Sequence, residues 1–234
     1  MPVTVPHIVS DVMTTPAVAV GRDTRFKEIV RVMDERHVSA LPVVSGEGRV
    51  VGVVSEADLL PKEEFRDRLP TRSERIRLRS DLAKAAGVSA EEVMSAPAVT
   101  VRPDDTLARA ARLMAVHHVK RLPVVDAEDG LRGIVSRGDL LRVFLRSDEE
   151  IEEEVRRTVV SCLFPLHAHA IHVSVRDGVV RLLGPVHDTS LIWVAERLVS
   201  GLEGVVGVES RLSGEGSGPD SPASEPWPST DRQG

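Results

Sequence analysis

Residues 41–58 read LPVVSGEGRVVGVVSEAD, and the stretch returns at residues 122–139 as LPVVDAEDGLRGIVSRGD. The match extends outward from both stretches, because residues 12–60 align with residues 93–141 without a gap. The two segments share 22 of 49 positions, including an amino-terminal Val-Met-x-x-Pro and a closing Asp-Leu-Leu. Internal identity at this level indicates a duplicated structural unit.

Both copies of the repeat predict the same order of elements: strand, helix, strand, strand, helix. Residues 40–44 and 50–55 are apolar runs separated by a polar, Gly-containing turn, which is typical of a hairpin. A second helix is expected from Glu56 and, in the second copy, from Arg137, and Pro61 should disturb the first of these. Apolar residues at helical spacing predict the preceding helix; they are Phe26, Ile29, Val30 and Met33 in one copy and Leu107, Ala110, Ala111 and Met114 in the other.

A single copy of about 50 residues is too small for a substantial core. We therefore expect the two copies to pack as a pair about a pseudo-twofold axis, with their apolar strands covered by helices. Such an arrangement creates two equivalent pockets between the copies, and pockets at interfaces between elements are common ligand sites.

The combination of V-M-(T/S)-x-P, L-P-V-V and G-h-V-S-x-x-D, present twice in register, resembles the CBS motif. CBS motifs occur in tandem as a Bateman module, and the resemblance covers residues 9–146. It implies a mixed α/β fold of two βαββα units. We assign residues 1–60 and 92–146 to the two motifs and residues 61–91 to a charged helical connector.

The resemblance also implies an adenosine-containing ligand, such as AMP, ADP, ATP or S-adenosylmethionine. It assigns the ribose hydroxyls to Asp58 in one pocket and Asp139 in the other, with Ser55 and Ser136 close to ribose or phosphate. A carboxylate suits a vicinal diol, because both hydroxyls can donate to it. The residues that the resemblance places around adenine are Ala40, Leu41 and Pro42 in one pocket and Leu122 and Pro123 in the other.

The same Ser-x-x-Asp spacing has a second explanation. In both copies it fits a capping box, in which the serine caps a helix and the acid three residues later binds back to the backbone. Each cap would contribute about 1 kcal/mol to stability. Capping and ligand binding are compatible, so the spacing alone leaves both roles open.

The residues before Leu-Pro distinguish the two pockets. The second copy has Lys120 and Arg121 there, whereas the first has Ser39 and Ala40. In relatives with this motif, basic residues at these places reach the nucleotide phosphates, and Arg137 would add a third contact. We expect Lys120 and Arg121 to converge beside Asp139 and to favour a phosphate there. The alternative is that they are ordinary surface bases.

Residues 147–213 predict another small domain with the order helix, strand, strand, helix, strand. Asp177 and Gly178 form a hairpin turn between its first two strands. The sequences of residues 173–184 and 201–208 resemble the BON domain, whose proposed roles are phospholipid binding and attachment. Such a role does not transfer through fold alone. Residues 214–234 are rich in Gly, Ser and Pro and are expected to be disordered.

Cysteine and histidine residues give no clear sign of a metal site. Cys162 is the only cysteine, so it forms no internal disulfide, as is common in a reducing cytoplasm. It follows the apolar helical spacing of Val159, which predicts a buried, inert thiol. His167, His169 and His172 do not share one strand face, so we expect surface or packing roles for them.

Composition narrows the class of protein. The 234 residues carry a net charge of −6 and only 3% aromatic residues, which disfavours a nucleic-acid-binding surface. We recognise no signal peptide, membrane-spanning run, Walker loop or catalytic triad, and expect no cofactor. The sequence thus predicts a cytoplasmic, non-catalytic regulator that binds an adenine nucleotide and signals through homodimer packing or the BON domain to an unknown protein partner. The alternatives are a ligand-free structural homodimer and, less favoured, attachment to membrane phospholipid or nucleic acid.

Overall fold

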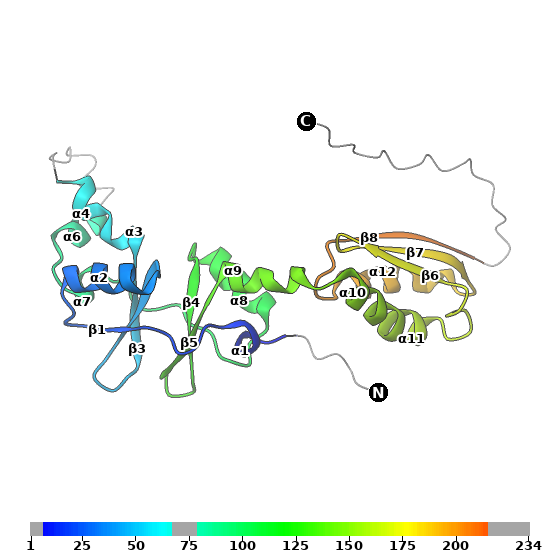
Figure 1. Ribbon diagram of the computed structural model, residues 1–234, viewed down its shortest axis with the longest axis horizontal. Helices are drawn as coiled ribbons and strands as arrows, with labels where there is room; N and C mark the ends of the chain where they lie inside the picture. Colours follow the sequence, from blue (N-terminus) through cyan, green and yellow to red (C-terminus); the bar gives the residue numbers. More distant parts are fainter. Residues whose placement is uncertain (1–6, 67–78, 215–234) are drawn as a thin grey trace. The chain divides into compact units, whose positions relative to one another are not determined.

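The computed structural model describes residues 7–66 and 79–214, which form two compact units, with the division along the chain between Val143 and Phe144 (Figure 1). The amino-terminal unit contains both copies of the repeat, and the carboxy-terminal unit contains the second predicted domain. The tail expected to be disordered is residues 214–234, but Gly214 is the last residue of a strand. The rest of the tail is residues 215–234, and the centre of the predicted connector is residues 67–78. Both stretches lie outside the described residues.

The first repeat, residues 12–60, forms a three-stranded sheet with the order β1-β2-β3. Strand β1 is parallel to β2, and β2 is antiparallel to β3. The fully buried Ile29 of the preceding helix packs with Leu41 and Val54 of the sheet. The elements are β1 (Val20–Gly21), α2 (Phe26–Arg36), β2 (Ala40–Val44), β3 (Val50–Ser55) and α3 (Glu56–Leu59).

The second repeat, residues 93–141, has the same order of elements. Its first strand is reduced to a single parallel bridge between Val101 and Val124. Strands β4 and β5 pair antiparallel, and Met114 packs with Leu122 in the core. The βαββα pattern predicted for each copy is confirmed. The elements are α8 (Leu107–Val116), β4 (Arg121–Val125), β5 (Leu131–Ser136), α9 (Arg137–Leu140) and the 3-10 helix η1 (Leu141–Leu145).

The start of each repeat packs on the other repeat. Helix α1 (Val9–Val12) belongs to the core of the second repeat, and Thr14 pairs with Ile134 of β5. Helix α7 (Ala90–Val93) in turn belongs to the core of the first repeat, and Ser95 pairs with Val53 of β3. The two repeats therefore exchange their amino-terminal segments. Each segment packs into the core of the other repeat and pairs with one of its strands.

Two glycines allow this exchange. A Cβ atom on Gly52 would lie 2.5 Å from the Met94 sulfur, and one on Gly133 would lie 2.7 Å from the Met13 sulfur. Each methionine comes from the amino-terminal segment that crosses over. The glycine of the G-h-V-S-x-x-D motif is thus required by close approach of the other repeat's Val-Met-x-x-Pro segment.

The connector contributes two short helices to the amino-terminal unit. Helix α3 ends at Leu59, and Pro61 is the first residue of α4 (Pro61–Glu64), a position that its missing N–H favours. Helix α6 (Arg79–Ala86) lies beside them and is held by Lys62, whose Nζ donates to the Ala85 carbonyl at 2.8 Å. The equivalent helix α9 ends at Leu140 with Arg142 in the place of Pro61, so the effect of Pro61 on the end of α3 stays a prediction.

The carboxy-terminal unit is a three-stranded sheet with the order β6-β7-β8, whose core includes Val173, Leu182 and Val199. Asp177 and Gly178 both have positive φ, which gives the predicted hairpin turn between β6 and β7. Strand β8 runs parallel to β7 after the α12 crossover. The elements are α10 (Asp148–Val155), the π-helical turn η2 (Arg156–Val160), α11 (Ser161–Leu163), β6 (His172–Arg176), β7 (Val179–Val186), η3 (Thr189–Leu191), α12 (Ile192–Ser200) and β8 (Gly207–Gly214).

The prediction for Cys162 is wrong, because its thiol is exposed. The π-helical turn over residues 156–160 adds a residue to the turn and rotates the helix face that follows it. Val159 and Val160 are both buried, and the next buried residue is Phe164 rather than Cys162. The regular spacing assumed from the sequence does not continue through this turn.

Two histidines of the carboxy-terminal unit form a stacking contact. The rings of His167 and His187 are parallel, with centroids 6.4 Å apart. Within residues 7–66 and 79–214, no three His, Cys, Asp or Glu side chains gather in a way that could hold a metal ion. In the same residues, no helix has the length and apolar character needed to cross a membrane.

Candidate functional site

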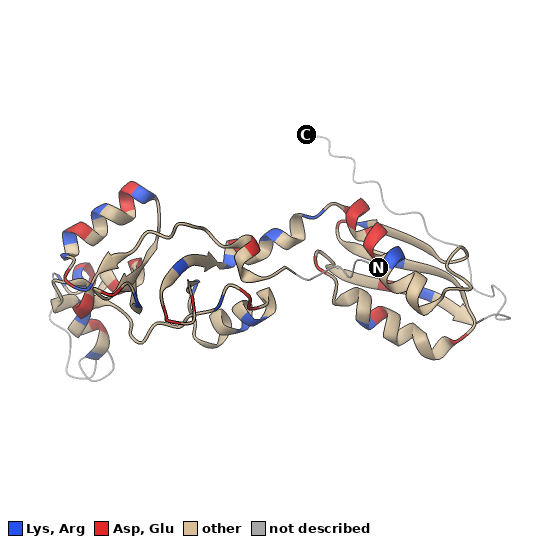
Figure 2. Cartoon of the chain, turned by 90° about the horizontal axis from the view of Figure 1, so that it is seen from below, with Lys and Arg blue, Asp and Glu red and all other residues tan. Residues whose placement is uncertain are grey.

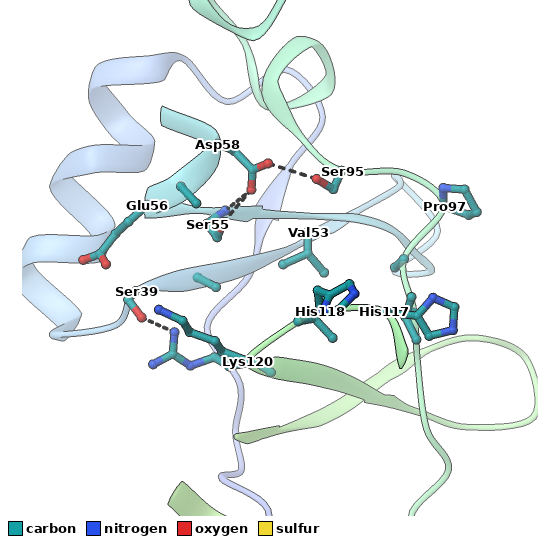
Figure 3. A pocket seen from close by; sticks show the side chains of 16 residues that line it. Ser39, Val53, Ser55, Glu56, Asp58, Ser95, Pro97, His117, His118 and Lys120 are labelled. Atoms are coloured by element: carbon teal, nitrogen blue, oxygen red, sulfur yellow. Dashed lines mark hydrogen bonds between the residues drawn. The ribbon is translucent and has the colours of Figure 1, made fainter. Parts of the chain in front are cut away.

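A pocket of about 360 Å³ lies between the two repeats of the amino-terminal unit (Figure 3). This volume falls within the range of small-molecule sites. The residues that line it are Ser39, Ala40, Val53, Ser55, Glu56, Ala57 and Asp58 of the first repeat and Ser95, Pro97, Ala98, Val99, His117, His118, Val119, Lys120 and Arg121 of the second. The exchange of amino-terminal segments brings Ser95 to the first repeat's side of this pocket, beside Asp58.

One side of the pocket is built around Asp58, which is 8% exposed. Its Oδ2 accepts from the Ser55 N–H at 2.8 Å and from the Ser55 hydroxyl at 2.6 Å. Its Oδ1 accepts from the Ser95 hydroxyl at 2.9 Å and from the Lys84 ammonium of α6. Figure 3 shows Ser55 and Ser95 directed toward Asp58. The carboxylate is thus oriented by four donors, two of which are hydroxyl groups that line the pocket.

The facing side of the pocket is basic and comes from the second repeat. His117, His118, Lys120 and Arg121 line it, and Figure 3 shows His118 and Lys120 across from Asp58. The Arg121 guanidinium donates to the Ser39 hydroxyl of the first repeat. A ligand between these sides would meet a hydrogen-bond acceptor for hydroxyl groups at one end and cationic donors for an anion at the other.

The structure groups the basic residues differently from the sequence-based expectation. Lys120 and Arg121 line the pocket of Asp58, whereas we expected them beside Asp139. Arg121 begins β4 and lies opposite Ser136 along the backbone pairing, yet its side chain extends to Ser39 across the repeat interface. Spacing along the chain could not reveal this, because the pocket takes each of its sides from a different repeat.

The Asp139 carboxylate occupies the equivalent place in the second repeat. Its Oδ2 accepts from the Ser136 N–H at 2.9 Å and from the Ser136 hydroxyl at 2.6 Å, which completes the predicted capping box. Its Oδ1 lies 3.7 Å from the exposed Arg142 guanidinium. Arg137 donates to the Val119 carbonyl at 3.0 Å. None of Ser136, Arg137 and Asp139 is among the residues that line the pocket of Asp58.

The residues expected around adenine fall into two groups. Ala40 lines the pocket, while Leu41 and Leu122 are fully buried in the cores of the two repeats. Pro42 and Pro123 are buried in β2 and β4 and are not among the residues that line this pocket. Each proline belongs to a strand whose first residue, Ala40 or Arg121, lines the pocket.

Sequence reasoning missed Ser95, Lys84 and the two histidines. Ser95 belongs to the Val-Met-x-x-Pro motif, but nothing in its spacing indicates that it reaches Asp58 of the other repeat. Lys84 lies in the charged connector among many similar side chains. His117 and His118 precede Lys120 directly, so their place in the same basic segment was the available signal.

Two family models match the chain. The model described as the CBS domain matches residues 9–62 and 90–146, and the model described as the BON domain matches residues 147–215. Together they account for both structural units.

The matches to similar proteins lie mainly in the amino-terminal unit. An uncharacterised protein of Methanocaldococcus jannaschii is 32% identical over 154 residues, which are 59% of this chain and 91% of that protein. The crystal structure of CBSX2 in complex with AMP has 31% identity and a TM-score of 0.53, and the match covers 59% of this chain and 97% of that structure. A homoserine O-acetyltransferase of Methanohalobium evestigatum is 30% identical over 135 residues, but this stretch is only 24% of that enzyme. The chain thus spans a minor part of some curated relatives.

Proposed function

Because the chain belongs to the CBS-domain proteins and carries a BON domain after its CBS pair, we propose that it is a non-catalytic regulator that binds an adenine nucleotide. The ligand binds in the pocket between the two CBS motifs. The observation that carries this proposal is the pocket itself, which has the Asp58 carboxylate on one side and Lys120 and Arg121 on the other.

The two sides suit the two polar ends of a nucleoside phosphate. Asp58 accepts from the hydroxyls of Ser55 and Ser95, and both serines line the pocket. Ribose hydroxyls can replace these two donors without leaving the carboxylate unsatisfied. The phosphate then faces Lys120 and Arg121, where charge-assisted hydrogen bonds are available. The AMP bound to CBSX2, which shares the fold at 31% identity, supports an adenosine ligand of this size.

Thermal unfolding with AMP and with adenosine tests the proposal. Ligand at 100 times its dissociation constant stabilises the folded state by about 2.7 kcal/mol. For a chain of this size we expect AMP to raise the unfolding midpoint by roughly 5–10 °C. Adenosine should raise it less, because it leaves the basic side of the pocket without an anion.

A pair of charge variants locates the phosphate. Lys120→Gln should reduce the advantage of AMP over adenosine, whereas Lys27→Gln removes the same charge from an exposed site outside this pocket and should leave it unchanged. Equal unfolding midpoints with and without millimolar AMP would contradict the proposed function.

Homodimerisation through the CBS pair is the second candidate, and exposed leucines favour it. Leu60 and Leu141 hold equivalent places in the two repeats and are 63% and 60% exposed. An apolar residue that is exposed at the same place twice suggests a surface covered by another chain. Sedimentation of the protein with and without AMP tells whether assembly occurs and whether the nucleotide alters it.

The BON domain is proposed as the part that passes the signal to a partner. Its Trp193 and Leu166 are 67% and 88% exposed, so apolar contact area is available. Basic and acidic residues are interspersed in both units (Figure 2), which favours a protein partner over an anionic membrane or nucleic acid.

A further inference from the structure

The Lys84 ammonium occupies one oxygen of the carboxylate that the proposed function assigns to ribose. Lys84 lies on α6, and its side chain is 16% exposed while that of Asp58 is 10% exposed. Its Nζ donates to Asp58 Oδ1 and also to the Ser95 hydroxyl oxygen at 2.9 Å. Lys84 is not among the residues that line the pocket, so it reaches Asp58 from the connector rather than from the ligand's side.

The Asp58 carboxylate has no free capacity in this arrangement. A carboxylate offers about four lone-pair sites. Ser55 supplies two donors to Oδ2, and Lys84 and Ser95 supply two donors to Oδ1. A ribose diol would bring two further donors, so existing donors must leave when it binds.

Ser95 links the departing donors to Lys84. Its hydroxyl donates to Asp58 and accepts from Lys84, so a ribose hydroxyl that displaces it from Asp58 Oδ1 disturbs a group that the ammonium also binds. The Lys84 contact with Asp58 then shares Oδ1 with the ribose. Both effects weaken the attachment of Lys84 to the first repeat, and α6 is also held by Lys62, whose Nζ donates to the Ala85 carbonyl.

Asp139 has a different cationic partner in the part of the chain that the structure describes. There, the exposed Arg142 guanidinium lies 3.7 Å from Asp139 Oδ1. The carboxylates of Asp58 and Asp139 therefore differ in the cation that binds them and in how exposed that cation is.

We propose that Lys84 competes with the ribose hydroxyls of a bound nucleotide for Asp58, so that nucleotide binding and the docking of α6 oppose each other. This rests on the proposed function of the same pocket. It makes the charged connector a readout of nucleotide occupancy, because filling the pocket loosens α6.

Calorimetric titration of AMP into the full chain tests the competition. The protein carries Asp139→Asn, so that the Asp58 pocket is measured alone. Adding Lys84→Met should tighten AMP binding about tenfold, because the Asp58 carboxylate no longer has to be released from Lys84 before the ribose can bind. Lys84→Arg keeps the charge and should leave the affinity near that of the parent. Lys120→Met removes a cation that lines the same pocket and should weaken binding, the opposite sign.

Hydrogen exchange gives a second readout that needs no change at Lys84. In the Asp139→Asn parent, AMP should speed exchange of the amides of residues 79–86, although bound ligands usually slow exchange. Unfolding midpoints of each variant verify that it is folded.

The outcomes separate the two proposals. Tighter binding by Lys84→Met with faster α6 exchange supports the competition, as does AMP binding that appears only in Lys84→Met. If the parent binds AMP but Lys84→Met binds it equally or more weakly, or α6 exchange is unchanged or slowed, the competition is overturned and the proposed function stands. If no variant binds AMP, the proposed function fails and the competition fails with it.

Discussion

Asp58 and Asp139 hold the same place in the two repeats, and both accept from the N–H and the hydroxyl of a serine three residues earlier. They differ at the second oxygen. That of Asp58 is engaged by the buried Lys84 and by Ser95, whereas that of Asp139 lies near the exposed Arg142. A duplicated capping box can thus serve one helix start as a simple cap and another as part of a wider polar network.

The comparison extends to the cores and to the hairpin turns. Ile29 on α2 and Ala110 on α8 are equivalent and both fully buried, so the two cores are filled differently at the same place. The β2-β3 turn has Ser45 where the β4-β5 turn has Asp126. Each of these pairs offers a substitution in one repeat and a matched one in the other.

The largest effect is expected in the cores. Ile29→Ala should destabilise the protein by roughly 3–4 kcal/mol, because it leaves a cavity as well as losing apolar burial. The reciprocal Ala110→Ile should also destabilise, by about 1–3 kcal/mol, because a close-packed site must accommodate extra volume. Urea unfolding measures both. A gain of stability from Ala110→Ile would mean that the second core is underpacked rather than differently packed.

The second largest effect is expected when the carboxylates of Asp58 and Asp139 are removed, and the loss of stability should differ between them. Asp58→Ala leaves the Lys84 ammonium without its charged partner in a largely buried place, and we expect a loss of roughly 2–3 kcal/mol. Asp139→Ala removes mainly a helix cap and should cost about 1 kcal/mol. Urea unfolding of the two variants under the same conditions makes the comparison. Equal losses would show that the Lys84 contact adds nothing to the cap.

The smallest effect concerns pH and the hairpin turns. Hydrogen bonds from the backbone N–H of Gly130 and of Glu128, together with the nearby Arg132 charge, hold the pKa of Asp126 below its ordinary value of 3.8. A carboxyl with a lowered pKa in the folded state stabilises the protein at pH values above its ordinary pKa. This contribution is lost as the pH falls from the ordinary pKa through the lowered pKa of the folded state.

Asp126→Ser, which copies the first repeat's turn, should therefore make the loss of stability between pH 5 and pH 3 shallower by a small amount. Unfolding midpoints over that range measure it. Ser45→Ala changes the equivalent turn without a titrating group and should leave the pH dependence unaltered. A parallel shift of the Asp126→Ser curve at every pH would contradict the assigned role of this carboxyl.

Local patterns in the sequence determined much of this protein. The repeat, the helical spacing, the Ser-x-x-Asp caps and the Asp177-Gly178 turn depend on residues a few positions apart, so they can be read along the chain. The order of elements in both repeats and in the BON domain followed from them, as did the resemblance to both families.

Tertiary structure alone decided how these parts meet. The exchange of amino-terminal segments places Ser95 of one repeat on Asp58 of the other, and it sets Lys120 and Arg121 across from Asp58 rather than beside Asp139. The contact between Lys84 and Asp58 joins residues 26 positions apart, and the π-helical turn exposes Cys162. These features depend on packing between distant segments, and no spacing along the chain encodes which of many similar side chains the packing brings together.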